Sequence, residues 1–404
     1  MNELKKRTKV PNNRKKYWFP NMLLFYLLRL NVCRDKNLWI FGSWEGNRYD
    51  DNSRHLFEYI REMHPDIRAV WLANCENIVS EIRKKGYEAY ISGSREGRRI
   101  QLRAGAVFYT NGIDDFGNIG YFYGAKIISL WHGFGIKNIY FAGMKKDIRY
   151  WKNRLQNRIF SWVGRDITIS SSKACSDYFR RAFCLRKEQI QITGFPRNDI
   201  FRKQLKPSDV FGDKKADEYR FMLYMPTYRS YKDFSIQETV EQIAGDRVLS
   251  AAFRKQKTVL LVKKHYLTEL EWKHLPSEIK VLEDSQVSSV QELLAISDLI
   301  ITDYSSCILD YVLSGKPAVL YAPDRKTYCM NVGMAKKWHK VYDRYSLDSY
   351  QELKQVLLEC LSGEKGIADE TTEYLRGICE DESIKGTNYC ENVYRLVYQS
   401  VFGR

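Results

Sequence analysis

The chain has 404 residues, with 65 lysines and arginines against 49 aspartates and glutamates, which gives a formal net charge of +16. A chain of this length exceeds one ordinary hydrophobic core, so we expect two domains of roughly 200 residues each. A hydrophobic fraction of 44% and a charged fraction of 28% exclude a disordered or collagen-like chain. No uninterrupted apolar run approaches the ~20 residues of a spanning helix, which argues against a polytopic membrane protein.

The N-terminal segment, residues 1–37, places many lysines and arginines before a short apolar stretch at 22–28. The stretch lies between Pro20 and Arg29 and lacks a small-residue cleavage site, so we do not expect a signal peptide. Basic residues beside aromatic and leucine residues suit a segment that lies on an anionic membrane surface. The alternative is a basic tail before a helix that packs on the protein's own core.

The nine cysteines are scattered along the chain and form no C-x-x-C pair. This spacing predicts neither a zinc site nor a disulfide framework, and a reducing cytoplasm fits it best. The high positive charge is typical of proteins with a polyanionic partner, although a solvated basic surface explains it equally well.

From residue 38 onward, short β-rich runs alternate with helical patterns. In the first half we expect strands at 38–43, 68–73, 89–92, 106–110, 126–131, 166–170 and 191–193, and helices at 52–63, 77–85 and 94–103. Strands at this spacing with helices between them are typical of parallel βαβ units.

A polar, charged stretch at 202–219 is expected to be a linker, after which the alternation restarts. Strands are then expected at 221–225, 259–263, 281–282, 299–302 and 318–321, and helices at 288–296 and 306–313. We therefore predict an α/β fold with two Rossmann-like domains, at 38–201 and 220–404, that face a cleft. In such folds the ligand lies outside the carboxyl ends of the strands.

The clearest site signal is the run 299–310, where an apolar strand ends at Asp303 and a helix begins near Ser305 and Ser306. Free N–H groups at a helix N-terminus, together with serine hydroxyls, form an anion site. Asp310 lies one helical turn further on and is expected to face the same cleft. The alternative is that one serine is simply the N-cap of the helix.

A second signal is His132, which ends the strand at 126–131 and is followed by Gly133, Gly135 and Lys137. Histidine is well suited to accept a hydroxyl proton near neutral pH, and glycine lets the backbone approach a ligand. A lone histidine is also commonly structural, and that interpretation stays open here.

Further strand ends carry cationic or polar side chains. Lys263 and His265 end the strand at 259–263, where a cation and a histidine would suit a diphosphate. The alternative is a strand end that frays into a solvent-facing basic loop. Thr227 and Arg229 follow another strand in a polar, cationic turn.

Arg197 and Asn198 close the first half in the run 193–199, where glycine and proline fix the backbone. They are expected either to lie near the site or to hold the domain junction. The remaining histidines lack ligand spacing, so no metal site is expected.

Residues 144–163 interleave basic and aromatic or aliphatic side chains at helical spacing. Such a basic amphipathic helix suits an anionic lipid surface or a polyanionic acceptor. The alternative is a surface helix whose apolar stripe packs on the first domain.

Taken in order, these motifs resemble the CDP-glycerol glycerophosphotransferase family of bacterial teichoic acid and related capsule synthesis, over roughly residues 38–325. The matching pieces are Trp131-His132-Gly133 with Lys137, the runs 194–199 and 225–229, His265, and the run 301–306 continuing to Asp310 and to 315–317. Each piece is weak by itself, whereas five in the same order are specific.

The resemblance implies a two-domain GT-B fold with no required metal or cofactor. It also implies transfer of a polyol phosphate, from glycerol or ribitol, from a CDP-polyol donor to a lipid-linked polyol-phosphate or saccharide acceptor, with release of CMP. The implied location is the cytoplasm, peripherally on the inner face of the cell membrane.

The resemblance also assigns roles to residues. His132 resembles the base that deprotonates the acceptor hydroxyl, and His265 resembles a partner of the donor phosphate. Ser305 and Ser306 resemble pyrophosphate binders, and Asp303 and Asp310 would shape the nucleotide side. Together with the strand ends above, the predicted donor and phosphate residues are Thr227, Arg229, Lys263, Asp303, Ser305, Ser306 and Asp310, and the predicted acceptor-loop residues are Gly133, Lys137, Arg197 and Asn198.

Two alternatives remain at this stage. One is a GT-B glycosyltransferase that moves a sugar from a nucleotide donor through the same cleft. The other is a basic module that binds a membrane or nucleic acid without catalysis, although no nucleic-acid-binding motif is present and no nucleic-acid partner is expected.

Overall fold

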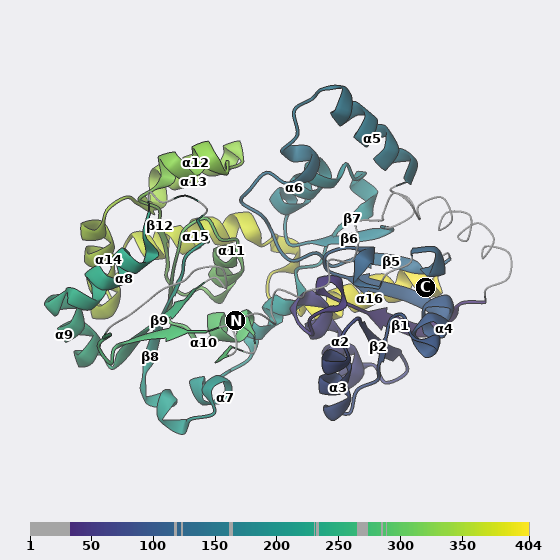
Figure 1. The fold of residues 1–404 in the computed structure, drawn as a ribbon, viewed down its shortest axis with the longest axis horizontal. Coiled ribbons are helices and arrows are strands. Elements are labelled where there is room, and N and C mark those ends of the chain that lie inside the picture. The colour runs from purple at the N-terminus through teal and green to yellow at the C-terminus, as the bar shows by residue number, and fades with distance from the viewer. Residues whose placement is uncertain are drawn as a thin grey trace, which may run out of the picture. The chain divides into compact units, whose positions relative to one another are not determined.

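The structure is a computed structural model that describes residues 33–116, 119–122, 124–160, 165–229, 231, 234–264, 274–283, 286–287 and 289–403 (Figure 1). The chain divides into two compact units, which are described separately. Unit 1 comprises the described residues of Met1–His132, Leu155–Ile169 and Cys390–Arg404, and unit 2 comprises those of Gly133–Arg154 and Ser170–Tyr389. Most of the predicted N-terminal segment, residues 1–32, lies outside the described residues.

The first sheet has seven strands in the order β3-β2-β1-β4-β5-β6-β7. The strands are β1 (Asp35–Phe41), β2 (Arg68–Ala73), β3 (Ala89–Ile91), β4 (Ala104–Tyr109), β5 (Lys126–Ser129), β6 (Ile167–Ser170) and β7 (Ile190–Ile192). The central strand β1 pairs in parallel with β2 and with β4, and its Trp39 lies opposite both Ala69 and Ala106. Because β1 is covered on both faces, its last four residues are all buried, as is typical of a parallel sheet.

Helices accompany this sheet, and two of them begin at a serine that caps the first turn. The helices are α2 (Asp51–Met63), α3 (Glu76–Lys84), α4 (Arg95–Arg103), α5 (Ile148–Phe160), α6 (Lys173–Phe183) and α16 (Tyr389–Phe402). The Ser94 side chain accepts from the Gly97 amide at the start of α4, and Ser172 accepts from the Cys175 amide at the start of α6. Helices α2 and α3 pack on β2 (Figure 1).

The second sheet has six strands in the order β10-β9-β8-β11-β12-β13. The strands are β8 (Arg220–Met225), β9 (Thr258–Lys263), β10 (Ile279–Leu282), β11 (Leu299–Thr302), β12 (Ala318–Tyr321) and β13 (Ser346–Leu347). All of their pairings are parallel. In both sheets the strand order reverses direction once, between β1 and β4 and between β8 and β11, as in doubly wound α/β folds.

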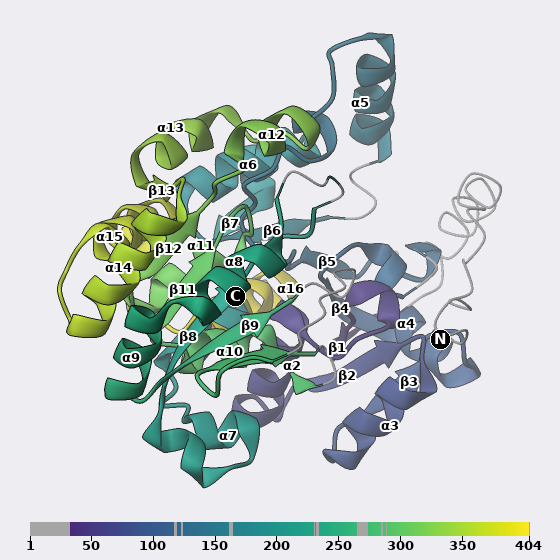
Figure 2. The ribbon, with the colours of Figure 1, turned by 60° about the vertical axis from the view of Figure 1, so that its left-hand side comes forward.

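Helices surround the second sheet. They are α7 (Pro207–Phe211), α8 (Ile236–Gly245), α9 (Arg247–Lys255), α10 (Val290–Ile296), α11 (Cys307–Tyr311), α12 (Arg325–Asn331), α13 (Lys336–Tyr345), α14 (Tyr350–Ser362) and α15 (Ile367–Cys379). Figure 2 shows α14 and α15 side by side, with α15 next to β12. Helix α14 begins with a capping box formed by Ser349 and Glu352.

Each sheet carries its own apolar core. In the first, Leu38, Ile40, Val70 and Val107 form one cluster with residues of α4 and the loops. In the second, alternating residues of β8, β9 and β11 pack with α8, α9 and α14. Burial of this apolar area is the main force that holds each sheet against its helices.

The structure confirms an α/β architecture with two parallel sheets, and it confirms the strands that we predicted from sequence to within a few residues. The predicted linker at 202–219 differs, because the structure forms α7 there and a short 3-10 helix at Lys214–Glu218. Pro207 at the start of α7 and Gly212, in a left-handed conformation at its end, are the residues that bound this short helix. Across the part of the chain that is described, no helix is both long and apolar enough to span a bilayer.

Candidate active site

The carboxyl ends of the strands where each sheet reverses its order are the places where α/β folds bind ligands. In unit 2 this place lies after β8 and β11, and in unit 1 it lies after β1 and β4, with the end of β5 next to β4. Most of the predicted site residues that the structure describes follow one of these strand ends.

In unit 2, Arg229 is held between two buried aspartates. Its guanidinium lies 2.9 Å from an Asp303 oxygen and donates through Nε to Asp324 Oδ2 at 2.7 Å and through Nη2 to Asp324 Oδ1 at 3.1 Å. All three side chains are at most 3% exposed. The ion pairs therefore join the turn after β8 to the segments that follow β11 and β12.

The charges in this cluster support one another. Burial alone would lower the pKa of Arg229, but the carboxylates of Asp303 and Asp324 raise it above the usual value. Burial raises the pKa of Asp303 despite the opposing charge of Arg229. Burial also opposes ionisation of Asp324, yet hydrogen bonds from Arg229 and Tyr231 hold its pKa below the usual value. Arg229 is thus charged, and its guanidinium is paired with the carboxylates of Asp303 and Asp324. This pairing favours a role in which Arg229 holds the loops around a phosphate, and direct contact between Arg229 and a phosphate stays a prediction.

Tyrosines complete the cluster. The Tyr304 hydroxyl donates to Asp324 at 3.0 Å, and the Tyr342 hydroxyl donates to the Asp303 carbonyl at 2.5 Å. The Tyr304 ring stacks on Tyr328 with centroids 3.5 Å apart, and the Arg229 guanidinium lies 4.9 Å from the Tyr304 centroid. Sequence analysis included Tyr304 in the run 301–306 without giving it a role. It missed Tyr328, Tyr342 and Asp324, which lie after β12 and outside the motifs that it used.

Thr227 and Lys137 belong to the same neighbourhood. The Thr227 amide donates to both Asp303 oxygens, at 2.9 and 3.0 Å. The Lys137 ammonium lies 5.7 Å from the centroid of the Tyr328 ring. Burial lowers the pKa of Lys137, while the charge of Asp303 opposes that shift. The sequence grouped Lys137 with the acceptor loop, whereas the structure places it beside residues predicted for the donor.

Ser305 and Ser306 lie at the junction between β11 and α11, as the sequence predicts. The Ser305 hydroxyl accepts weakly from the Cys307 amide at 3.4 Å. Ser306 occupies the N-cap position without a capping hydrogen bond from its side chain. The Ser306 hydroxyl therefore does not cap the helix, whereas the weak bond from the Cys307 amide leaves the capping alternative open for Ser305. Both residues are half-buried.

Asp310 joins two of the predicted motifs. It accepts from Arg197 Nη2 at 2.5 Å and from Asn198 Nδ2 at 2.9 Å, and Asn198 in turn accepts from Gln291 at 2.9 Å. Arg197 and Asn198 lie on a short 3-10 helix, Pro196–Arg202. Gly133 lies against this pair in a conformation with φ of +104°, and a Cβ atom there would collide with the Arg197 guanidinium. Asp310, predicted for the donor, thus forms one contact group in unit 2 with three residues predicted for the acceptor, which are Gly133, Arg197 and Asn198.

Lys263 is the remaining predicted site residue of unit 2 that the structure describes. It is buried at the end of β9, and its ammonium lies 3.5 Å from the Lys264 carbonyl oxygen. The neighbouring Lys264 pairs with Glu283 at 2.9 Å. His265 lies outside the described residues, so its placement stays a prediction.

In unit 1, His132 follows β5 and lies among aromatic rings. Its ring stacks on Trp131 with centroids 3.9 Å apart and lies 5.8 Å from the Trp44 ring. Trp131 itself has φ of +51°, a conformation that non-glycine residues rarely adopt. The histidine is half-buried, so it lies between the core and the surface at the carboxyl end of the sheet.

A buried carboxylate holds the loop that carries Trp44. Asp115 accepts from the Glu45 amide at 2.6 Å and from the Thr110 amide at 3.0 Å, which joins the loop after β1 to the end of β4. Burial raises the pKa of Asp115 to about 6, although these backbone donors oppose the shift.

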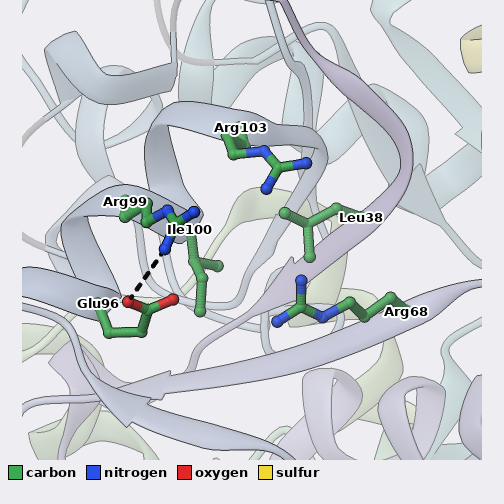
Figure 3. Close-up of a pocket in the computed structure, with 6 residues that line it drawn as sticks. All are labelled: Leu38, Arg68, Glu96, Arg99, Ile100 and Arg103. Carbon is green, nitrogen blue, oxygen red and sulfur yellow. Dashed lines mark ion pairs between the residues drawn. The ribbon is translucent and has the colours of Figure 1, made fainter.

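A separate cavity of about 230 Å³ lies elsewhere in unit 1 (Figure 3). It is lined by Leu38, Arg68, Glu96, Arg99, Ile100 and Arg103. Arg68 is the first residue of β2, so the cavity is at the amino ends of the strands. Its three arginines pair with Glu88, Glu96 and Asp35 at 2.6, 3.9 and 3.6 Å, and we do not assign it to a phosphate. Among the described residues, no group of three or more His, Cys, Asp or Glu side chains is placed to hold a metal ion.

The family "CDP-Glycerol:Poly(glycerophosphate) glycerophosphotransferase" matches residues 24–399, which is most of the chain. The chain belongs to this family. The resemblance inferred from the sequence motifs is therefore confirmed, and so is the prediction that the protein is an enzyme of the glycerophosphotransferase type. The motif order had identified the family from residues 38–325, a shorter stretch than the match covers.

Individual family members are distant in sequence. The chain is 24% identical to a teichoic acid poly(glycerol phosphate) polymerase of Staphylococcus epidermidis, over 72% of this chain and 40% of that protein. It is 25% identical to a teichoic acid glycerol-phosphate transferase of Staphylococcus aureus, over 74% of this chain and 77% of that protein. The chain thus spans less than half the length of the first relative and about three quarters of the second.

The fold also matches solved structures. The wall teichoic acid polymerase TagF superposes with a TM-score of 0.69 at 19% identity, over 97% of this chain and 98% of that chain. A TagF variant soaked with CDPG gives the same TM-score at 20% identity, over 97% and 98%. At this identity the likeness establishes the fold of this glycerophosphotransferase family member.

Proposed function

We propose that this glycerophosphotransferase family member moves a polyol phosphate from a CDP-polyol to a hydroxyl of a lipid-linked or polymer acceptor, with release of CMP. The observation that carries the proposal is the family match over residues 24–399. The names of the relatives, which include glycerol-phosphate and ribitol-phosphate enzymes of teichoic acid synthesis, support polyol phosphate as the transferred group. The polymer that receives the polyol phosphate is proposed to be a teichoic acid or a capsule-type polymer of the cell envelope.

The proposed architecture is of GT-B type, with Rossmann-like domains at 38–201 and 220–404 that face a common cleft. The doubly wound strand order in each sheet supports two Rossmann-like halves. In this arrangement the acceptor approaches the residues after β5, and the donor approaches those after β8, β9 and β11. The two groups of predicted residues would then meet at the reacting phosphorus.

On the donor side, the diphosphate would lie over the junction of β11 and α11. Half-buried hydroxyls at Ser305 and Ser306 supply donors, and Lys137 and Lys263 supply positive charge. Arg229 and Asp303 would not contact the diphosphate themselves but would fix the turn that carries Thr227. Phosphoryl transfer depends mainly on such positioning and charge neutralisation, and no resident metal is invoked.

On the acceptor side, His132 would be the general base. Its ring takes the proton of the acceptor hydroxyl as that oxygen bonds to the β-phosphorus of the donor. The bond between the β-phosphorus and the bridging oxygen breaks at the same time, and CMP leaves with the electron pair. A histidine in this role contributes about 10²–10⁴-fold to the rate. His265 is proposed to contact the donor phosphate.

The proposed location is the inner face of the cell membrane, with an anionic lipid surface as a partner. Helix α5 supports this, because Ile148, Trp151 and Leu155 recur at helical spacing and are 87%, 54% and 60% exposed. Lys152 and Arg154 lie beside them, also exposed. An exposed apolar stripe bordered by cations suits the boundary between headgroups and acyl chains. The basic residues in 1–37 would add electrostatic attraction.

The proposal is tested by CMP release from CDP-glycerol and from CDP-ribitol, each with a lipid-linked polyol-phosphate acceptor. We expect acceptor-dependent CMP with one of these donors and a loss of about 10²–10⁴-fold in His132→Ala. A matched control is His339→Ala, which removes a histidine on α13 that has no predicted role. Sugar transfer from a nucleotide sugar, with no CMP from either CDP-polyol, would instead favour the glycosyltransferase alternative.

A further inference from the structure

The first turn of α2 holds the ends of two strands of unit 1. Asn52 is fully buried, and its side-chain amide donates to the carbonyl oxygens of Leu130 at 3.2 Å and Trp131 at 2.9 Å. The hydroxyl of the next residue, Ser53, donates to the Gly42 carbonyl at 2.8 Å. Asn52 thus holds the backbone immediately before His132, and Ser53 holds a different strand end.

The backbone that Asn52 holds is in an uncommon conformation. Trp131 has φ of +51°, and such a conformation persists in a bulky residue only when its surroundings fix it. An asparagine amide nitrogen carries two hydrogens, so one side chain reaches two successive carbonyls. A serine has one such donor and an ionised aspartate has none.

This conformation sets the direction of the His132 ring. The ring stacks on Trp131 at 3.9 Å between centroids, so a change at Trp131 moves the imidazole directly. We propose that Asn52 is the positioning residue for His132, and that it acts by fixing the Leu130 and Trp131 carbonyls. The inference rests on the proposed function for its effect on the rate, since there His132 is the base.

The kinetic test compares Asn52→Ala with the matched control Ser53→Ala, which also removes a buried hydrogen bond from the first turn of α2. We expect Asn52→Ala to lower kcat for acceptor-dependent CMP release about 10- to 100-fold with little change in the KM for the donor. Ser53→Ala should stay within about threefold of the parent chain. Equal losses in the two variants would overturn the inference, because they would indicate a general effect on the fold.

A double-mutant cycle separates action through His132 from independent action. In a His132→Ala background, adding Asn52→Ala should cost less than about twofold, because the group that Asn52 positions is gone. Multiplicative losses would refute the positioning role. If His132→Ala keeps the parental rate, the proposed base is wrong, and the kinetic arm then reports on the proposed function instead.

A second measurement needs no activity. The chain has six histidines, and carbon-13 labelling of their rings gives few enough NMR signals for His132 to be assigned by its loss in His132→Ala. Asn52→Ala should shift or broaden the His132 signal and leave those of His274 and His339 unchanged, while Ser53→Ala should leave all three in place. An unchanged His132 signal in a folded Asn52→Ala protein overturns the inference even if the proposed function holds.

Discussion

Replacing Arg229 by methionine tests the buried charge cluster of unit 2. The substitution keeps much of the side-chain volume but leaves Asp303 and Asp324, each 2% exposed, without their shared cation. Removing one partner of a buried ion pair costs about 3–5 kcal/mol of unfolding free energy, since the remaining charge stays buried. For a domain of this size that corresponds to a fall in Tm of about 6–20 °C.

The loss in Tm caused by Arg229→Met should depend on pH. Arg229 contributes to holding the pKa of Asp324 below its usual value, so the pair stabilises the fold above the usual aspartate range and loses that effect as the pH falls. In Arg229→Met the buried carboxyls become neutral more readily, so the deficit in Tm should shrink from pH 7.5 toward pH 5. Thermal unfolding followed by circular dichroism at several pH values measures both effects.

Arg325→Met is the matched control for this experiment. It removes an arginine that pairs at 2.7 Å with Asp343, whose side chain is 64% exposed. Exposed pairs contribute about 0–1 kcal/mol, so this variant should unfold within a few degrees of the parent chain. The reasoning is refuted if Arg229→Met costs no more than Arg325→Met, or if its deficit is the same at every pH.

Three further predictions concern other parts of the chain. Burial raises the pKa of Asp115 to about 6, so the contribution of this carboxyl to stability is greatest at acid pH and is lost as the pH rises through that value. Asp115→Asn should therefore flatten the change in Tm between pH 5 and 7, and an unchanged pH profile of Tm would contradict this. Gly133→Ala should lower the free energy of unfolding, measured with denaturant, by about 1–3 kcal/mol, because φ there is +104° and the new Cβ meets the Arg197 guanidinium. Gly245→Ala places its Cβ in open space and should lower the free energy of unfolding much less. Trp151→Glu should weaken binding to phosphatidylglycerol-containing vesicles about tenfold or more, and equal binding in a sedimentation assay would remove α5 from the membrane proposal.

The strands and the family were predictable because both depend on short-range pattern. A buried parallel strand needs a run of apolar residues, and β2 and β11 follow the predicted runs residue for residue. The serines after β11 were found for a similar reason, since a strand end followed by hydroxyl residues and a helix is a local signal. The short helix α7 was missed because its helical stretch is only five residues long.

The grouping of the candidate site residues was less predictable. Lys137 and Tyr328 come together although nearly two hundred positions separate them, and Asp310 meets Arg197 across 113 positions. No periodicity links such residues. Tyr328 lies on α12, Asp310 on α11 and Arg197 on a short 3-10 helix, whereas Lys137 lies in a loop after β5. The position of each of these segments depends on how the strands before and after it are ordered in the sheet.

The sequence by itself determined the α/β alternation, the family and the positions of the polar strand ends, since these follow from local apolar runs and from motif order. Only the tertiary structure decided that Arg229 is committed to Asp303 and Asp324, that Lys137 lies beside them, and that Asn52 holds the backbone before His132. The physical reason is that buried polar groups must find partners wherever the folded chain supplies them, and those partners come from distant segments that the sheet order brings together.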